Sequence, residues 1–190
     1  MSLKIALLGL LDLSPQSGYD LKKNIEASVA HFWSADQSQI YRTLTRLVAE
    51  GLADVEVVPQ EGRPDRREHR ITDTGRSALQ SWLRSPLPAE TPHDAFLMRL
   101  FFVGTLGVPA ARALLRARRS QATALLASLR AVSERESGRE QGTREQATPG
   151  QAADDPGDLG RRLRLATLRN GILHAEAELA WIVETKAALS

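Results

Sequence analysis

One face of the segment from Ser38 to Glu50 carries the side chains best suited to chemistry in this sequence. On a helical wheel, the segment has an apolar seam made of Ile40, Leu44, Leu47 and Val48. The opposite side carries Ser38, Arg42, Thr45 and Ala49, with Gln39 and Arg46 beside them. Arg and Gln side chains read base edges in the major groove of DNA, and hydroxyl groups contact phosphate oxygens. The pattern predicts a DNA-contacting face, with an ordinary solvated helix face as the alternative.

A second group of cations stands at the tip of an expected β-hairpin, in the stretch Gly62–Arg67. These cations are Arg63, Arg66 and Arg67. A tip of this kind can reach phosphates or a minor groove. Asp65 and Glu68 dilute the positive charge and can pair with the arginines. The stretch predicts a second DNA contact, with a solvated turn as the alternative.

The elements that position these residues follow from the hydrophobic pattern of the first half of the chain. Helices are expected at 3–13, 19–30, 38–50 and between Thr72 and Ser85, strands at 52–58 and 66–71, and a turn at 14–18. Asp36 and Gln39 have the spacing of a capping box, and Gly51 stands where a left-handed residue ends a helix. The order helix–helix–helix–strand–loop–strand is typical of a winged helix-turn-helix.

After Pro92 the pattern is helical except for one stretch. A compact apolar helix is expected at 95–103, and two longer segments carry heptad seams. The first seam is Ala111, Leu115, Arg118, Ala122, Leu125, Leu129 and Val132, and the second is Leu165, Leu168, Ile172, Ala175, Leu179 and Ile182. Between them, residues 138–157 are polar, contain Gly and Pro and lack periodicity, which predicts a mobile loop.

These patterns predict a mainly α protein with two domains. Residues 1–85 form an N-terminal winged helix-turn-helix with a small two-stranded wing, and residues 90–190 form an all-helical C-terminal dimerisation domain. The second seam is apolar on its other side as well, and the first helix has almost no polar face, so both need a partner from a second copy. The candidate dimerisation residues are Leu7, Leu11, Leu125, Leu129, Leu165, Leu168, Ile172, Leu179 and Ile182.

Several classes of function are excluded by what the sequence lacks. The 190 residues contain no Cys and carry a net charge of +2, so a thiolate metal site, a disulfide framework and a bulk polycation are ruled out. The four His have no metal-ligand spacing, and no P-loop, G-x-S-x-G or G-x-G-x-x-G motif is present. No apolar run approaches the roughly 20 residues that span a bilayer. We therefore expect no enzyme, no metal, no cofactor and no membrane contact, and a cytoplasmic protein without a secretory signal.

Residues 3–83 resemble the DNA-binding domain of the PadR-type (phenolic-acid decarboxylase regulator) transcriptional regulators. The matching residues are Gly9-Leu10-Leu11, Ser17-Gly18-Tyr19-Asp20-Leu21, Phe32-Trp33, Gln39-Ile40-Tyr41, Leu44, Leu47, Glu50-Gly51-Leu52, Gly62-Arg63-Pro64, Ile71-Thr72, Gly75-Arg76, Leu79 and Trp82-Leu83. Residues 94–102 resemble the start of the helical C-terminal domain of the larger, virulence-activator-like members. Arg42 departs from the Pro that is common in the family, and His69 from its Tyr.

The resemblance implies a homodimeric, operator-binding regulator, usually a repressor, that answers to a small aromatic or amphipathic effector. The candidate DNA-binding residues are Ser38, Gln39, Tyr41, Arg42, Thr45, Arg46, Arg63, Arg66 and Arg67. The candidate effector pocket is Trp33, Phe101 and Trp181, for which core packing is the alternative. The competing interpretation of the whole chain is a winged-helix module that binds protein and does not bind specific DNA.

Overall fold

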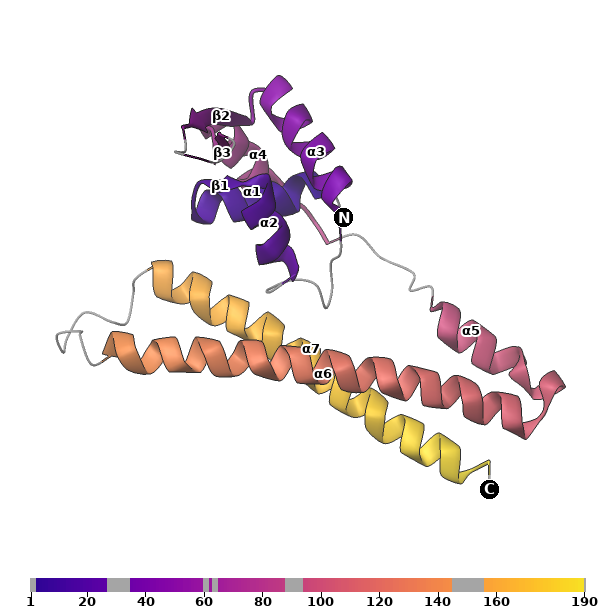
Figure 1. Cartoon of the computed structure of the whole chain (residues 1–190). Helices are drawn as coiled ribbons and strands as arrows, with labels where there is room; N and C mark the ends of the chain where they lie inside the picture. Colours follow the sequence, from indigo (N-terminus) through magenta and orange to yellow (C-terminus); the bar gives the residue numbers. More distant parts are fainter. Residues whose placement is uncertain are drawn as a thin grey trace. The chain divides into compact units, whose positions relative to one another are not determined.

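The chain folds as two compact units, Met1–Ala89 and Glu90–Ser190, each with its own hydrophobic core. The structure is a computed structural model that describes residues 3–26, 35–59, 62, 65–87, 94–144 and 156–189 (Figure 1). The predicted mainly α fold is confirmed: a winged helix-turn-helix precedes an all-helical region.

The described part of the first unit contains four helices and a small sheet. Its elements are α1 (Leu3–Leu13), β1 (Gln16–Ser17), α2 (Gly18–Asn24), α3 (Gln37–Ala49), β2 (Ala53–Val58), β3 (Arg66–Ile71) and α4 (Asp73–Arg84). The end of the helix predicted at 19–30 lies in residues 27–34, outside the described part of the chain.

The wing sheet has three antiparallel strands in the order β1-β3-β2, where two strands and a turn at 14–18 were predicted. In the third strand, β1, Gln16 pairs with His69 and Ser17 pairs with Glu68. A two-residue strand has no periodicity, so the sequence pattern did not reveal it. Ser17 is also the N-cap of α2, where it accepts a hydrogen bond from the backbone of Asp20. The wing is thus joined directly to the start of α2.

The third helix is fixed at both ends as predicted. Its N-cap is Asp36, which forms a reciprocal capping box with Gln39. At the other end Gly51 has a φ of 68°, the left-handed conformation that favours glycine. Its N–H donates to the Val48 carbonyl (3.0 Å), and the N–H of Leu52 donates to Leu47 (2.9 Å). This pair of bonds is a Schellman motif, and it leads from α3 into β2 with no intervening loop.

The first turn of α4 packs against that same connection. Thr72, the predicted N-cap, donates from its backbone to the carbonyl of Leu52 (3.1 Å) and from its hydroxyl to the carbonyl of Gly51 (2.8 Å). A Cβ at Gly75 would lie 2.1 Å from the Leu52 oxygen. Only glycine therefore fits at this position, and α3, β2 and α4 meet at one backbone junction.

Helix α1 completes the core of the first unit. This position corrects the expectation that Leu7 and Leu11 contact a second copy of the chain. Leu7 and Leu11 are fully buried there, packed in the same cluster as Leu21, Leu44 and Leu79. Their side chains offer no surface to a second chain. A helix that is apolar almost all round signals burial, but the sequence alone does not say by which partner.

The second unit consists of α5 (Ala95–Phe102), the 3₁₀ helix η2 (Val103–Leu106), α6 (Val108–Arg144) and α7 (Pro156–Ala187). The two long helices run antiparallel and cross side by side (Figure 1). Arg118 donates to Glu178 (2.6 Å) and Arg130 donates to Glu176 (2.8 Å), which fixes the register of the pair. The mobile loop was predicted too long, because α6 continues through 138–144; residues 145–155 lie outside the described part of the chain.

Most of the two heptad seams pack against each other within one chain. Leu129, Leu168 and Ile172 share one buried cluster, Leu179 packs against it, and Ile182 is fully buried. Leu165 is half-buried. Leu125, expected in the seam, is 38% exposed, and its neighbour Leu126 is buried instead. A straight helix has 3.6 residues per turn and drifts away from a strict 3.5 repeat, which explains the change of one position.

Candidate nucleic-acid interface

The outward face of α3 is exposed where the helical wheel placed it. Ile40, Leu44 and Leu47 are buried, whereas Arg42, Thr45 and Arg46 are exposed on the other side. The hydroxyl of Thr45 donates to the carbonyl of Tyr41 (3.1 Å), and a lone pair remains for another donor. Two guanidinium groups and a hydroxyl thus share one exposed helix face.

The first turn of α3 uses two of the candidate contact residues for its own cap. The hydroxyl of Ser38 donates to the Asp36 carboxylate (2.6 Å), and the side-chain oxygen of Gln39 accepts from the backbone N–H of Asp36 (3.2 Å). The Ser38 hydrogen bond is the main reason that the pKa of Asp36 lies below its usual value. Ser38 and Gln39 therefore hold the helix start in place, and their freedom to read bases is reduced.

The two arginines of the face differ in their surroundings. The Nε of Arg42 donates to the carbonyl of Ser38 (3.3 Å), which leaves the outer guanidinium nitrogens toward solvent. Arg46 pairs with Glu50 (3.5 Å), and Glu50 also pairs with Lys4 of α1. The hydrogen bond from Lys4 holds the pKa of Glu50 below its ordinary range, so its carboxylate stays ionised beside Arg46. Both pairs are exposed, and Arg46 can exchange Glu50 for a phosphate at low cost.

Tyr41 has a packing role that the sequence did not predict. Its ring lies over the start of α2, where a Cβ at Gly18 would come within 2.6 Å of the ring carbon Cε1. The ring is still 43% exposed. Gly18 and Tyr41 together allow the two helices of the helix-turn-helix to approach closely.

The arginines of the wing are not equivalent. Arg67 is exposed and forms no ion pair with any residue that the structure describes. Arg66 lies against two carboxylates, those of Asp20 (2.9 Å) and Glu68 (3.4 Å). Arg63 lies outside the described residues. The predicted pairing with Glu68 is confirmed for Arg66, whereas its ion pair with Asp20 was not predicted, and the charge of Arg66 is therefore balanced.

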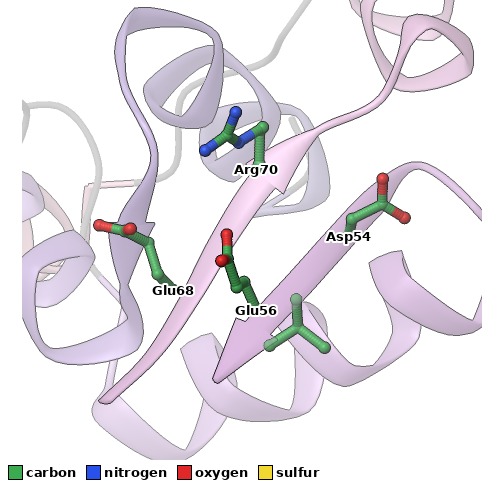
Figure 2. Close-up of a pocket in the computed structure, with 5 residues that line it drawn as sticks. Asp54, Glu56, Glu68 and Arg70 are labelled. Atoms are coloured by element: carbon green, nitrogen blue, oxygen red, sulfur yellow. The ribbon is translucent and has the colours of Figure 1, made fainter. Parts of the chain in front are cut away.

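A shallow groove on the open face of the wing sheet carries the opposite charge. Asp54, Glu56, Glu68 and Arg70 rise from β2 and β3 around it (Figure 2). Glu56 stands directly across the ladder from Glu68. In the described part of the chain, no three His, Asp or Glu side chains form a metal-binding group. Three carboxylates against one guanidinium make this face of the sheet unfavourable for a phosphate backbone. We therefore expect this face to point away from a bound duplex.

His69 is buried in the middle of the same sheet, on the side facing the core. It is 8% exposed, and its Nδ1 has no hydrogen-bond partner among the described residues. Burial lowers the pKa of His69, and the charge of Arg67 lowers it further, while a hydrogen bond to the backbone of Gln16 opposes both. The imidazole is therefore neutral in the folded protein near pH 7.

His69 makes the stability of the first unit dependent on pH. The unfolded chain protonates this His as the pH falls below about 6.5, whereas the folded chain resists protonation. We expect the free energy of unfolding to fall with pH from about 6.5 down to the lowered pKa of His69. Urea unfolding at pH 7.5 and 5.5 measures the loss. In His69→Tyr, whose side chain does not titrate in this range, the loss should be smaller; an equal loss would assign it to other groups.

Two of the three candidate effector residues contact other aromatic rings. Phe101 is 82% exposed and meets Phe102 edge-on, with ring centroids 5.0 Å apart. Trp181 meets Phe96 edge-on at 6.1 Å, and the guanidinium of Arg118 stands 5.1 Å from the Phe96 centroid. Trp33 lies outside the described residues. Trp181 thus helps to hold α5 against α7, and the effector pocket stays a prediction.

Two family models account for most of the chain. Residues 7–81 match the transcriptional regulator PadR-like family, and residues 92–190 match the virulence activator alpha C-terminal domain. The chain belongs to the PadR-like family of transcriptional regulators. The matched segments contain α3, the wing, α5 and both long helices.

Individual relatives agree with the assignment to the PadR-like family. The chain is 36% identical to the negative transcriptional regulator PadR of Bacillus subtilis over 106 residues, which is 55% of the chain and 58% of the relative. It is 37% identical over 92 residues to the probable transcriptional regulator Rv1176c of Mycobacterium tuberculosis, 48% and 49% of the two chains. The chain thus spans about half the length of the curated relatives it matches.

Solved structures extend the similarity to the whole chain. The structure of B. subtilis PadR in complex with operator DNA matches with a TM-score of 0.75 and 28% identity, over 99% of both chains. The same regulator in complex with p-coumaric acid matches with a TM-score of 0.64 and 27% identity, over 98% of this chain and 94% of that one.

These PadR-like relatives are named as transcriptional regulators, so the family is not one of enzymes and a module that binds only protein is not favoured. In the described part of the chain, no helix is long and apolar enough to cross a bilayer.

Sequence reasoning missed two exposed residues of α2 in this PadR-like domain, one in its first turn and one in its last. Tyr19 is 64% exposed, and Lys23 is exposed one turn further on. In a helix-turn-helix the first helix crosses the DNA backbone, so a phenol and an ammonium group there suit phosphate contacts. The sequence offered a signal only for Tyr19, which follows the Ser17 cap by two residues.

Proposed function

We propose that this chain is a DNA-binding transcriptional regulator that places α3 in the major groove of an operator. The observation that carries the proposal is the exposed face of α3, with Arg42 and Arg46 opposite a buried seam, in a chain of the PadR-like family. In this proposal the first unit binds DNA. Arg42 and Arg46 contact base edges, the Thr45 hydroxyl exchanges the Tyr41 carbonyl for a phosphate oxygen, and Arg63 and Arg67 contact the backbone or minor groove from the wing.

We propose further that the second unit joins two copies of the chain. Its support is apolar surface that one copy leaves exposed on the side of α7 away from α6. Leu159, Leu163 and Leu173 there are 46–59% exposed. A second exposed apolar surface lies on α5 and η2; it consists of Leu97, Met98, Phe101, Phe102 and Leu106. Exposed apolar surface of this extent is rare on monomers. A self-complementary interface with a two-fold axis removes such surface from water in both copies at once.

Regulation in this proposal is repression of a promoter in the cytoplasm, relieved by a small aromatic or amphipathic molecule. The support is the similarity to a negative regulator whose structure holds p-coumaric acid. The effector changes the spacing of the two copies of α3 and so shifts the population that fits the operator.

Selection from sheared genomic DNA of the source organism tests the proposal. We expect a recovered fragment to bind about 1000-fold or more tightly than random duplex at physiological salt. The fragment should contain an inverted repeat with half-site centres about 34 Å or a multiple apart. Titration by fluorescence anisotropy at several salt concentrations gives both affinities. Equal affinity for the recovered and the scrambled fragment would refute specific DNA binding.

A further inference from the structure

A cluster of charged side chains joins the start of β3, next to the wing tip, to the first turn of α2. Nη2 of Arg66 donates to Oδ2 of Asp20 at 2.9 Å and lies 3.4 Å from Oε1 of Glu68. The Ser17 hydroxyl donates to the same Oδ2 of Asp20 at 2.6 Å. We call these four residues, Ser17, Asp20, Arg66 and Glu68, the wing clasp.

The wing clasp connects segments that are far apart in the sequence. Asp20 belongs to the helix-turn-helix and Arg66 is the first residue of β3, 46 positions later, where the chain returns from the wing tip. The backbone supplies a second link at the same place, because Ser17 of β1 pairs with Glu68 of β3. A two-stranded ribbon is only marginally stable by itself, so these links set the direction in which the wing points.

The charge of Arg66 is already balanced inside the wing clasp. The hydroxyl of Ser17 is the main cause that keeps the pKa of Asp20 low, with Arg66 and Lys23 contributing, so Asp20 is an anion near neutral pH. Arg66 is exposed, whereas the carboxylates of Asp20 and Glu68 are partly buried, which reduces screening by solvent on their side of the pair. Arg67, the next residue, faces the other side of the strand and is exposed.

We propose that Arg66 is a positioning residue that holds the wing against α2 and thereby sets the specificity of binding, and that it does not contact DNA. The inference rests on the proposed function, and it assigns Arg66 and Arg67 opposite kinds of role. A positioning residue affects the fit to one sequence, whereas a phosphate contact strengthens binding to every sequence alike.

The test compares Arg66→Ala and Asp20→Asn with Arg67→Ala, using the selected fragment and a random duplex. We expect Arg66→Ala to lower the affinity for the selected fragment about threefold to fivefold, the size of a partly exposed ion pair, with no change in the salt slope. Arg67→Ala should weaken both duplexes and lower the slope of log affinity against log salt by about 1. Arg66→Lys, which keeps the charge beside Asp20, should retain most of the preference.

Asp20→Asn distinguishes most sharply between a positioning role of Arg66 and a phosphate contact, because the two roles predict opposite changes in DNA affinity. Loss of the clasp should lower the preference for the selected fragment. If Arg66 instead binds phosphate, its release from Asp20 should strengthen binding to both duplexes, which would overturn the inference, as would a fall of the salt slope in Arg66→Ala.

Hydrogen exchange of the free protein gives a readout without DNA. Amides of β2 and β3 should exchange faster in Arg66→Ala and in Asp20→Asn than in Arg67→Ala. Unchanged exchange in the first two variants overturns the inference whatever their DNA binding shows. A wild-type protein without any sequence preference overturns the proposed function, and the exchange comparison still decides whether the clasp holds the wing.

Discussion

Leu163→Glu combined with Leu173→Glu is expected to split the proposed dimer and to weaken operator binding about 100-fold or more, because the advantage of two linked binding units is lost. Both side chains are exposed on the side of α7 away from α6, at 59% and 46%. Carboxylates at these positions leave the single chain folded and are costly only where a second copy covers them. Sedimentation velocity gives the mass, and anisotropy titration gives the affinity.

The choice of positions decides whether this experiment can be interpreted. Charge at Leu168 or Ile182 would disrupt the α6–α7 pair of the single chain, because both side chains are buried within it. Ser120→Glu with Gln121→Glu is a matched control that adds two carboxylates on the exposed side of α6. The control should remain a dimer. A double leucine variant that keeps the mass and operator affinity of the wild type would contradict the proposed interface.

The second large effect is expected from Arg42→Ala with Arg46→Ala. Each arginine that reads a base is worth about 1–3 kcal/mol, so the pair should cost roughly 30-fold or more in operator affinity. Because both side chains are exposed, the thermal midpoint should change little. Arg84→Ala, an exposed arginine at the end of α4, is the control and should bind like the wild type.

The single variants add information on the recognition of sequence. Arg42 has no carboxylate partner in the described part of the chain, whereas Arg46 must leave Glu50 to reach DNA. Arg42→Ala should therefore show the larger loss. Wild-type affinity in both single variants would remove α3 from the interface.

Local signals in the sequence were sufficient for most of the first unit. The caps Asp36 and Thr72 and the left-handed Gly51 determine structure within a few residues, and each was predicted correctly. The seam of α3 also predicted which side is buried, because its period matches that of a helix.

The sequence pattern was less decisive where a residue has two potential partners. The side-chain oxygen of Gln39 is occupied by the predicted capping box, and its DNA contact stays a prediction. Leu7 and Leu129 were assigned to a second copy, and both are buried within their own chain. Arg66 was grouped with its neighbours in sequence, although its partner Asp20 is 46 residues away. Pattern analysis shows that a side chain needs a partner, and only the three-dimensional arrangement selects it.

The junction at the carbonyl of Leu52 has a consequence for how an operator can evolve. This oxygen accepts from Thr72 and leaves no room for a side chain at Gly75, so α3, β2 and α4 can shift only together. A DNA-binding unit whose three elements cannot move separately binds a half-site as a whole or does not bind it. In the proposed dimer, the length of the spacer between half-sites is then a separate variable. Promoters can be tuned to different effector responses through spacer length alone, while the half-site sequence that identifies them to the regulator stays unchanged.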